Sequence, residues 1–180
     1  MLFSKQGYKA TTMRELAEKT GLSAGSLYNY IKSKEDLLLD IQTKFIDEML
    51  GSIKEYGGRV SAAEKLENAC EAIIRAIARD QLAWKILIDQ FHLFPNSQQR
   101  KMKVKADELE NLIIGIIEEG SRAGEFSNVD SKFAALFFMG ACHHVSKWLR
   151  PKGKLSPQEI AKQFSSYVLH GLCKKDRNVA

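Results

Sequence analysis

Hydrophobic residues recur every three to four positions along most of this chain, the spacing of helices that bury one face. Two stripes show it most clearly: Leu66, Ala69, Cys70, Ile73 and Ile77, and then Leu109, Leu112, Ile113, Ile116 and Ile117. No segment alternates apolar and polar residues for long enough to indicate a strand. The pattern predicts an all-α protein.

Helix starts are marked where Ser, Thr or Asn is followed three residues later by an acid or Gln, because the two side chains then cap each other's backbone donors. Six pairs fit: Thr12/Glu15, Ser33/Asp36, Ser61/Glu64, Asn96/Gln99, Ser127/Asp130 and Ser156/Glu159. Glycines at positions 21, 57–58, 120 and 171 mark helix ends. These signals predict helices over 12–20, 24–31, 34–56, 61–79, 81–93, 97–120, 128–149 and 156–173, after the tail of an earlier helix at 1–5.

Charge and helix length both change within the predicted helix 34–56. Residues 1–34 hold six Lys or Arg against two Glu, a net charge of +4, whereas residues 35–56 sum to −4. A basic cluster attracts phosphate, although it is also an ordinary solvated surface. We therefore expect a small domain at 1–40 and a helical bundle at 41–180.

The first two predicted helices are joined by the short turn Thr20-Gly21-Leu22-Ser23, the spacing of a helix-turn-helix. Leu27 and Ile31 can pack inward, which turns a set of polar groups elsewhere: Ser26, Tyr28, Asn29 and Tyr30. Such groups suit base edges and phosphate oxygens. On this evidence alone, a plain helical hairpin with surface tyrosines is an equal alternative.

A stretch of about 30 residues carries a family resemblance. "GYKATTMRELAEKTGLSAGSLYNYIKSKEDLL", residues 7–38, resembles the DNA-binding signature of TetR-family transcriptional regulators. The resemblance implies that Thr12 caps the first motif helix and binds phosphate. It also implies a recognition helix lined by Ser23, Gly25, Ser26, Tyr28 and Asn29, with Tyr30 and Lys34 reaching the DNA backbone.

Some positions depart from the family signature. Ala24 stands where the family often has Lys, while Thr20 and Ile31 replace the usual Ala and Phe. Residues 1–3 fall near the end of the family's first helix, so we expect that helix of the three-helix module to be largely missing. The alternative function is therefore a helical ligand-binding or interaction protein that has lost operator binding.

The predicted helix 128–149 is apolar on nearly every side, which indicates burial on two sides. In a chain of this size, a second subunit can cover the outer side. The family habit of dimerising through the last two helices agrees with this. The predicted interface residues are Phe133, Gly140, Trp148, Phe164, Tyr167, Val168 and Gly171.

The resemblance also implies a ligand pocket inside the bundle. The residues we expect to line it are almost uncharged: Trp84, Phe91, Phe94, Leu112, Ile113, Ile116, Phe137 and Phe138. They favour a small apolar inducer. Residues 147–161, with four cations, resemble family members that respond to fatty acids or acyl-CoA, so an acyl-CoA is the favoured ligand. The alternative is that the aromatics fill the core and the cations are solvated.

Composition excludes several other classes of protein. With 180 residues, 44% hydrophobic and 27% charged, the chain has an ordinary globular composition. Three cysteines are too few for a disulfide scaffold and indicate reduced thiols in the cytoplasm. No signal peptide, membrane span or catalytic motif is recognisable, and the pairs Cys142/His143 and His170/Cys173 are better explained as core or interface residues than as metal ligands. We expect no enzyme activity, metal or cofactor; the expected partners are an operator duplex, an apolar inducer and a second copy. The family most often acts as a repressor.

Overall fold

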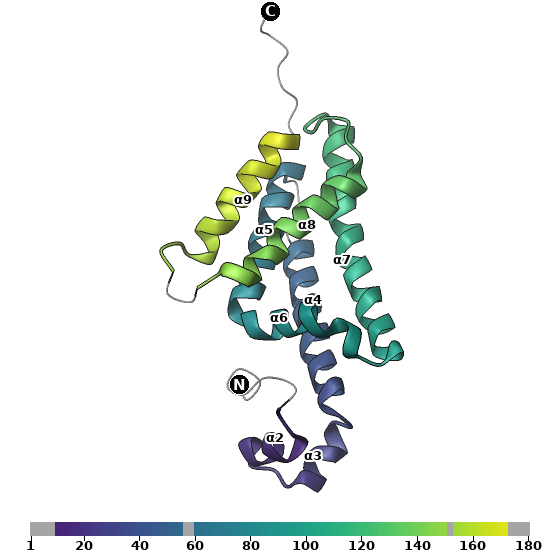
Figure 1. Cartoon of the computed structure of the whole chain (residues 1–180). Coiled ribbons are helices and arrows are strands. Elements are labelled where there is room, and N and C mark those ends of the chain that lie inside the picture. Colours follow the sequence, from purple (N-terminus) through teal and green to yellow (C-terminus); the bar gives the residue numbers. More distant parts are fainter. Residues whose placement is uncertain (1–9, 56–59, 151–152, 173–180) are drawn as a thin grey trace, which may run out of the picture.

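The structure, a computed structural model, describes residues 10–55, 60–150 and 153–172, which are helical with short connections (Figure 1). The helices are α2 (Met13–Thr20), α3 (Ala24–Tyr30), α4 (Lys34–Glu55), α5 (Ala62–Arg79), α6 (Gln81–Gln90), the 3₁₀ helix η1 (Phe91–Leu93), α7 (Asn96–Ala123), α8 (Ser131–Trp148) and α9 (Pro157–Leu172). Within the described ranges no strand is present, which confirms the all-α prediction. The helix tail expected at 1–5 and the helix end expected at 57–58 lie outside the described residues.

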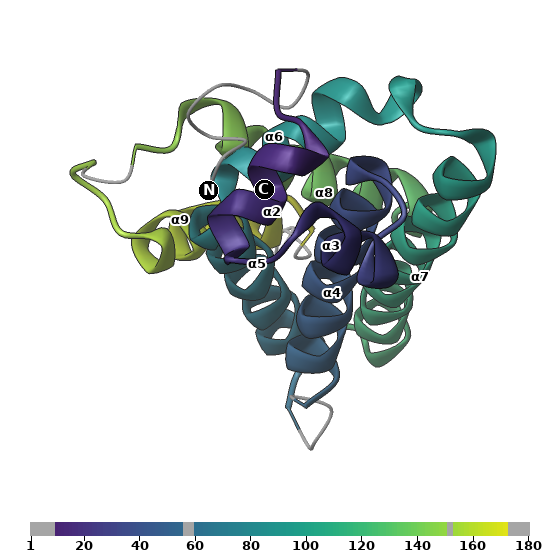
Figure 2. The ribbon, with the colours of Figure 1, turned by 90° about the horizontal axis from the view of Figure 1, so that it is seen from below.

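The helices form a small unit and a bundle. α2 and α3 lie at one end of the molecule, and the long α4 runs from them into a bundle with α5, α7, α8 and α9 (Figure 1). α6 lies across the end of the bundle that is nearer to α2 and α3. Viewed from that end, α2 and α3 lie in front of the bundle (Figure 2). No helix in the described part is long and apolar enough to cross a membrane.

Four of the six expected helix starts are confirmed. At Thr12, Ser61 and Ser156 the hydroxyl accepts from the backbone N–H three residues on, and the Glu at that position accepts from the cap's own N–H. Ser33 Oγ accepts from Asp36 N at 3.0 Å and donates to Asp36 Oδ2. These starts are local and depend only on neighbouring side chains, which makes them readable from sequence.

The other two expected starts are wrong. α7 begins at Asn96 directly after Pro95, with no side-chain cap, and the Gln99 amide donates to the Phe94 carbonyl instead. α8 begins at Ser131 because Asp130 is itself the cap and accepts from the backbone N–H of Lys132 and Phe133. A carboxylate beside two free N–H groups is the stronger acceptor, so Asp130 replaces Ser127 in this role.

Gly120 does not end α7, contrary to expectation. The helix continues to Ala123 and ends at Gly124, whose φ of 79° is left-handed. A Cβ on Gly120 would lie 2.4 Å from two ring carbons of Phe126 and 2.8 Å from the Ala62 Cβ. Glycine is therefore needed at position 120 for close packing rather than for helix termination.

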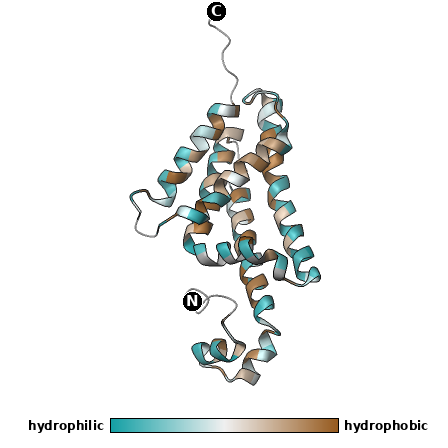
Figure 3. Cartoon of the chain, viewed as in Figure 1, coloured by the Kyte–Doolittle hydropathy of each residue, from teal (hydrophilic) through white to brown (hydrophobic). Residues whose placement is uncertain are grey.

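The main core draws on helices α4 to α9. Ile73, Ile113, Phe126 and Phe138 are among its fully buried side chains. Hydrophobic positions concentrate in the bundle, and α8 carries them along much of its length (Figure 3). Burial of these positions supplies the driving force for the bundle.

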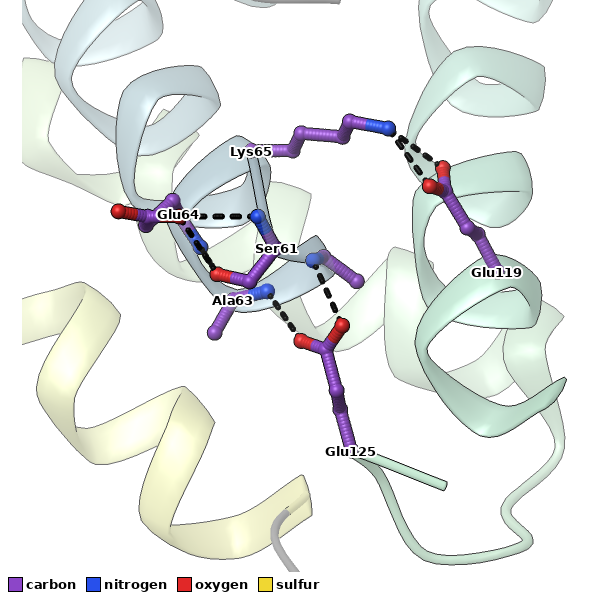
Figure 4. A network of polar contacts seen from close by, with 7 residues as sticks. Ser61, Ala63, Glu64, Lys65, Glu119 and Glu125 are labelled. Atoms are coloured by element: carbon purple, nitrogen blue, oxygen red, sulfur yellow. Dashed lines mark hydrogen bonds and ion pairs between the residues drawn. The ribbon is translucent and has the colours of Figure 1, made fainter. Parts of the chain in front are cut away.

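A polar network fastens the end of the bundle that is remote from α2 and α3 (Figure 4). The Glu125 carboxylate accepts from the backbone N–H of Ala62 and Ala63, both at 3.2 Å, at the positive end of α5. Lys65 Nζ donates to both carboxylate oxygens of Glu119 on α7, at 2.7 and 2.8 Å. These bonds join α5 to α7 and to the segment that follows α7.

Candidate functional site

The turn between α2 and α3 has the geometry of a helix-turn-helix. α2 ends at Gly21 with φ 72°, and the Gly21 N–H donates to carbonyls of the last turn. Leu22 N donates to the Ala17 carbonyl at 3.0 Å, and Ser23 then caps α3 by accepting from Ser26 N. Gly21 is needed because side chains rarely adopt this φ. The capping role expected for Thr12 is also confirmed.

α3 buries one side and presents the other to solvent. Leu27 and Ala17 are buried between the two helices, whereas Tyr28 is 51% and Tyr30 79% exposed. Gly25 and Asn29 are exposed as well, and α3 holds no charged side chain. We call Gly25, Tyr28, Asn29 and Tyr30 the α3 face. It is polar, uncharged and aromatic, as expected of a surface that approaches bases.

Three of the expected DNA contacts already have partners within the chain. The Ser23 and Ser26 hydroxyls lie 2.8 Å apart and bond to each other. Lys34 Nζ is partly buried and donates to the Thr11 carbonyl at 3.3 Å, which ties the entry of α2 to the start of α4. Phosphate contacts by Lys34, Ser23 or Ser26 remain predictions.

The sequence analysis did not single out two exposed lysines beside the α3 face. Lys19 ends α2, and Lys32 lies in the turn between α3 and α4; both are exposed. The net charge of the N-terminal stretch was the signal that could have identified them, because cations near a recognition helix contact phosphates.

A small joint connects the α2–α3 unit to the bundle. Leu38 and Phe94 are buried together, with Leu16 and Leu37 packed against them. Beside them, Gln98 Nε2 on α7 donates to Asp36 Oδ1 on α4 at 2.7 Å. We call Leu16, Leu37, Leu38 and Phe94 the joint.

A cavity of about 380 Å³ lies on the bundle side of this joint. Its lining residues come from α4, α6, η1, α7 and α8: Ile46, Trp84, Ile88, Phe91, Met102, Lys103, Ala106, Leu109, Met139 and His143. The volume falls within the range of about 300–1,000 Å³ that small-ligand pockets occupy. The almost entirely apolar lining suits an apolar ligand.

Only two of the eight expected lining residues, Trp84 and Phe91, border this cavity. Phe94 belongs to the joint, and Phe137 is 69% exposed on the outer side of α8. The others belong to the main core or pack against it: Leu112, Ile113, Ile116 and Phe138. Helical spacing shows which faces are apolar, but a void depends on how several faces meet. The aliphatic residues that complete the lining therefore carried no distinguishing signal.

Two polar atoms on the cavity wall have no hydrogen-bond partner within the described structure. They are Nε1 of Trp84 and Nε2 of His143, both buried. The two rings are neighbours, with centroids 5.2 Å apart. Burial lowers the pKa of His143 to about 4, so the imidazole is neutral near pH 7.

The outer side of α8 and α9 exposes large aromatic side chains. Phe133, Phe137 and Tyr167 are 73%, 69% and 72% exposed, and Trp148 packs against Phe164 with ring centroids 6.2 Å apart. Of the other residues expected in an interface, Gly140 and Gly171 are exposed with open space above them. Val168 instead lies in the main core. An exposed aromatic surface of this kind commonly marks an interface.

The cysteines form no disulfide in the described chain. Cys70 and Cys142 are free and buried, with their sulfurs 3.7 Å apart, and Cys173 lies outside the described residues. The hydrogen bond with Cys70 and burial raise the pKa of the Cys142 thiol. In the part of the chain that can be described, no three His, Cys, Asp or Glu side chains come together as a metal site.

Comparison with known proteins agrees with this geometry. Residues 1–41 match the family described as bacterial regulatory proteins, tetR family, and residues 59–172 match the tetracyclin repressor-like C-terminal domain. The HTH-type transcriptional repressor KstR2 of Rhodococcus jostii is 31% identical over 174 residues, which cover 95% of this chain and 85% of that protein.

Solved structures show the same fold. The ketosteroid transcriptional regulator KstR2 of Mycobacterium tuberculosis superposes with a TM-score of 0.83 at 23% identity, over 97% of this chain and 90% of that chain. AibR in complex with isovaleryl coenzyme A and operator DNA gives 0.78 at 21% identity, over 92% and 91%. With a helix-turn-helix at one end, a helical bundle at the other and both matched by family models, the chain belongs to the TetR family of DNA-binding transcriptional regulators.

Proposed function

We propose that this regulator is a cytoplasmic homodimeric repressor, which binds a palindromic operator through the α3 face and leaves it when a small apolar ligand fills the cavity. The α3 face carries the proposal, because its exposed polar groups follow a helix-turn-helix turn. The second helix of that motif is the one that enters the major groove. The relative in Rhodococcus jostii is named a repressor, and AibR was solved with operator DNA.

The proposed dimer uses the exposed aromatic surface of α8 and α9. Phe133, Phe137 and Tyr167 lie on it, and a second copy would remove them from water. A two-fold dimer places two α3 helices on one side of a duplex, about 34–36 Å apart, and therefore requires a palindromic site.

The proposed inducer is an acyl-CoA whose acyl part enters the cavity. The lining is apolar, and Lys103 at its edge offers a cation. AibR was solved with isovaleryl coenzyme A, and the Mycobacterium tuberculosis KstR2 is described as a ketosteroid regulator. Of the cations expected to hold the phosphates, Lys147 is paired with Asp89, Arg150 and Lys154 are exposed, and Lys152 lies outside the described residues.

The proposed coupling follows α4 from the joint to the cavity. Leu38, Gln42 and Ile46 are spaced four residues apart, so they share one face of the helix. Leu38 belongs to the joint and Ile46 to the cavity wall; on η1 and the residue after it, Phe91 borders the cavity and Phe94 the joint. A ligand that shifts these walls changes the position of α3, provided that it binds the two arrangements with different affinity.

Fluorescence anisotropy with DNA from upstream of the protein's own gene tests the DNA-binding role. Wild type should bind one fragment specifically, and Tyr28→Ala should weaken binding about tenfold or more without changing the melting temperature. Lys32→Ala should weaken binding to all sequences and reduce its salt dependence by about one ion. Lys101→Ala, an exposed lysine on α7, is the matched control.

Two outcomes of this titration would contradict the proposal. Unfolding of Tyr28→Ala would mean that this side chain supports the fold instead of facing DNA. Failure of the wild type to bind any upstream fragment specifically would favour the alternative, a helical ligand-binding protein without operator binding.

A further inference from the structure

Trp84 and His143 are chemically unlike the rest of the cavity wall. Their neighbours along it are mainly aliphatic, including Leu109, Met139 and Met102. Yet Nε1 of Trp84 and Nε2 of His143 are buried without a hydrogen-bond partner in the described structure. A buried polar atom without a partner is unfavourable, and the great majority of such atoms in folded proteins are paired. A polar pair beside an empty volume therefore indicates a ligand atom.

The two side chains restrict what that atom can be. The indole Nε1–H is a donor only, so the ligand atom near Trp84 must be an acceptor. Trp84 is 6% exposed, and a charged ligand group there would lose its hydration. His143 is neutral and gives a negative group no compensating charge. Lys103, the cation at the cavity edge, is already paired with Asp107.

We propose that the cavity recognises an apolar ligand that carries an uncharged oxygen, a ketone or a hydroxyl, bound between Trp84 Nε1 and His143 Nε2. The oxygen accepts from the indole N–H, while His143 donates to a ketone or accepts from a hydroxyl according to its tautomer. This inference rests on the proposed ligand-responsive function and names its ligand class more closely. It separates oxygenated ligands from saturated hydrocarbon chains of the same size.

The test compares 2-decalone with decalin, which has the same carbon skeleton without the oxygen. The protein holds two tryptophans, so a ¹⁵N-labelled sample gives two indole signals, and Trp148→Phe identifies the Trp84 signal. 2-Decalone should bind about tenfold or more tightly than decalin. It should also move the Trp84 indole proton downfield, whereas decalin should leave that proton without a new acceptor.

Substitutions then assign the preference to the two side chains. Trp84→Phe and His143→Phe should each bind 2-decalone and decalin more nearly equally. His143→Gln, which can keep a polar nitrogen near the position of Nε2, should retain part of the preference. His144→Phe, at the exposed neighbouring position, is the matched control and should behave as wild type.

The outcomes separate this inference from the proposed function. Equal binding of 2-decalone and decalin overturns the polar recognition but leaves an apolar inducer possible. Binding of neither compound overturns the cavity as the site for this ligand class, while operator binding is measured independently by anisotropy. A preference for 2-decalone that survives both Phe substitutions places the oxygen elsewhere and overturns the inference.

Discussion

The two ends of the bundle differ in how their polar groups and side chains are held. At the end remote from α2 and α3, Glu125 caps α5, Lys65 pairs with Glu119, and Phe126 is buried directly against Gly120. At the joint, a few leucines surround Phe94, and one hydrogen bond, from Gln98 to Asp36, crosses between α7 and α4.

Unpaired polar atoms are also unevenly distributed. Both amide atoms of Gln42 and Oε1 of Gln98 are buried without a partner in the described chain, and both residues lie on the joint side of the cavity. A region with few apolar contacts and unsatisfied polar groups has more than one arrangement of similar free energy. We therefore interpret the remote end as the fixed frame and the joint as the part that a ligand can shift.

Removing one phenylalanine from each end should give the largest contrast. Phe126→Ala leaves a cavity in the main core and should lower the free energy of unfolding by about 3–5 kcal/mol. Phe94→Ala should cost the whole chain less than half as much, because the bundle does not depend on the joint. Denaturant titration measures both.

Hydrogen exchange supplies the control for this pair. In Phe94→Ala, amides of α2, α3 and the first turns of α4 should exchange faster, while amides of α5 keep their protection. Equal losses of global stability in the two variants would mean that the joint is as integral to the fold as the remote end, against our interpretation.

Acid should act first on the cavity that lies between the two ends. The pKa of His143 is lowered from 6.5 to about 4 by burial. Above pH 6.5 both states are neutral, and as the pH falls towards 4 the unfolded state gains a proton that the native state does not. Stability should therefore fall by up to about 3 kcal/mol across this window.

The variant His143→Phe should remove most of this pH dependence and serves as its control. Melting temperatures between pH 7 and pH 4 are sufficient to measure it. A similar decrease in wild type and His143→Phe would show that other groups control acid sensitivity.

A single methyl group distinguishes packed from open glycines on α7. Gly120→Ala should lower stability by about 1–2 kcal/mol, since its clash with the Phe126 ring outweighs the gain in helix propensity. Gly115 has no atom within 4 Å of its expected Cβ, so Gly115→Ala should instead raise stability, by up to about 1 kcal/mol. Thermal melts of both variants give the comparison, and two shifts of the same sign would refute it.

The smallest expected effect concerns Gln42. Gln42→Leu replaces an unpaired buried amide by an apolar group of similar size and should raise stability by about 1 kcal/mol. It should also reduce the response of operator binding to ligand, because one arrangement of α4 becomes favoured. A destabilised Gln42→Leu would show that the amide has a partner in the native protein.

Local signals in the sequence predicted much of the fold. The capping pairs at Ser61/Glu64 and Ser156/Glu159, and the left-handed Gly21, are set by residues a few positions apart, so periodicity and turn chemistry located the helices that they bound. The same holds for the exposed α3 face, since Leu27 identifies the buried side of a short helix.

Features that depend on several elements were not predictable. Phe126 follows α7 outside any helical pattern, so nothing in its neighbourhood shows that it packs on Gly120. The cavity lies where five elements meet, and Met102 or Met139 is indistinguishable in sequence from other core residues. Burial of the two polar atoms on Trp84 and His143 appears only once α6 and α8 are placed together.

Operator binding measured with and without ligand tests the central claim, that the cavity and the α3 face are coupled through the joint. With the operator identified as above, saturating dodecanoyl-CoA should raise the Kd of the wild type for DNA about tenfold or more, equivalent to about 1.4 kcal/mol. By reciprocity, operator DNA should weaken dodecanoyl-CoA binding by the same factor. Tight binding of dodecanoyl-CoA with an unchanged operator Kd would contradict the account.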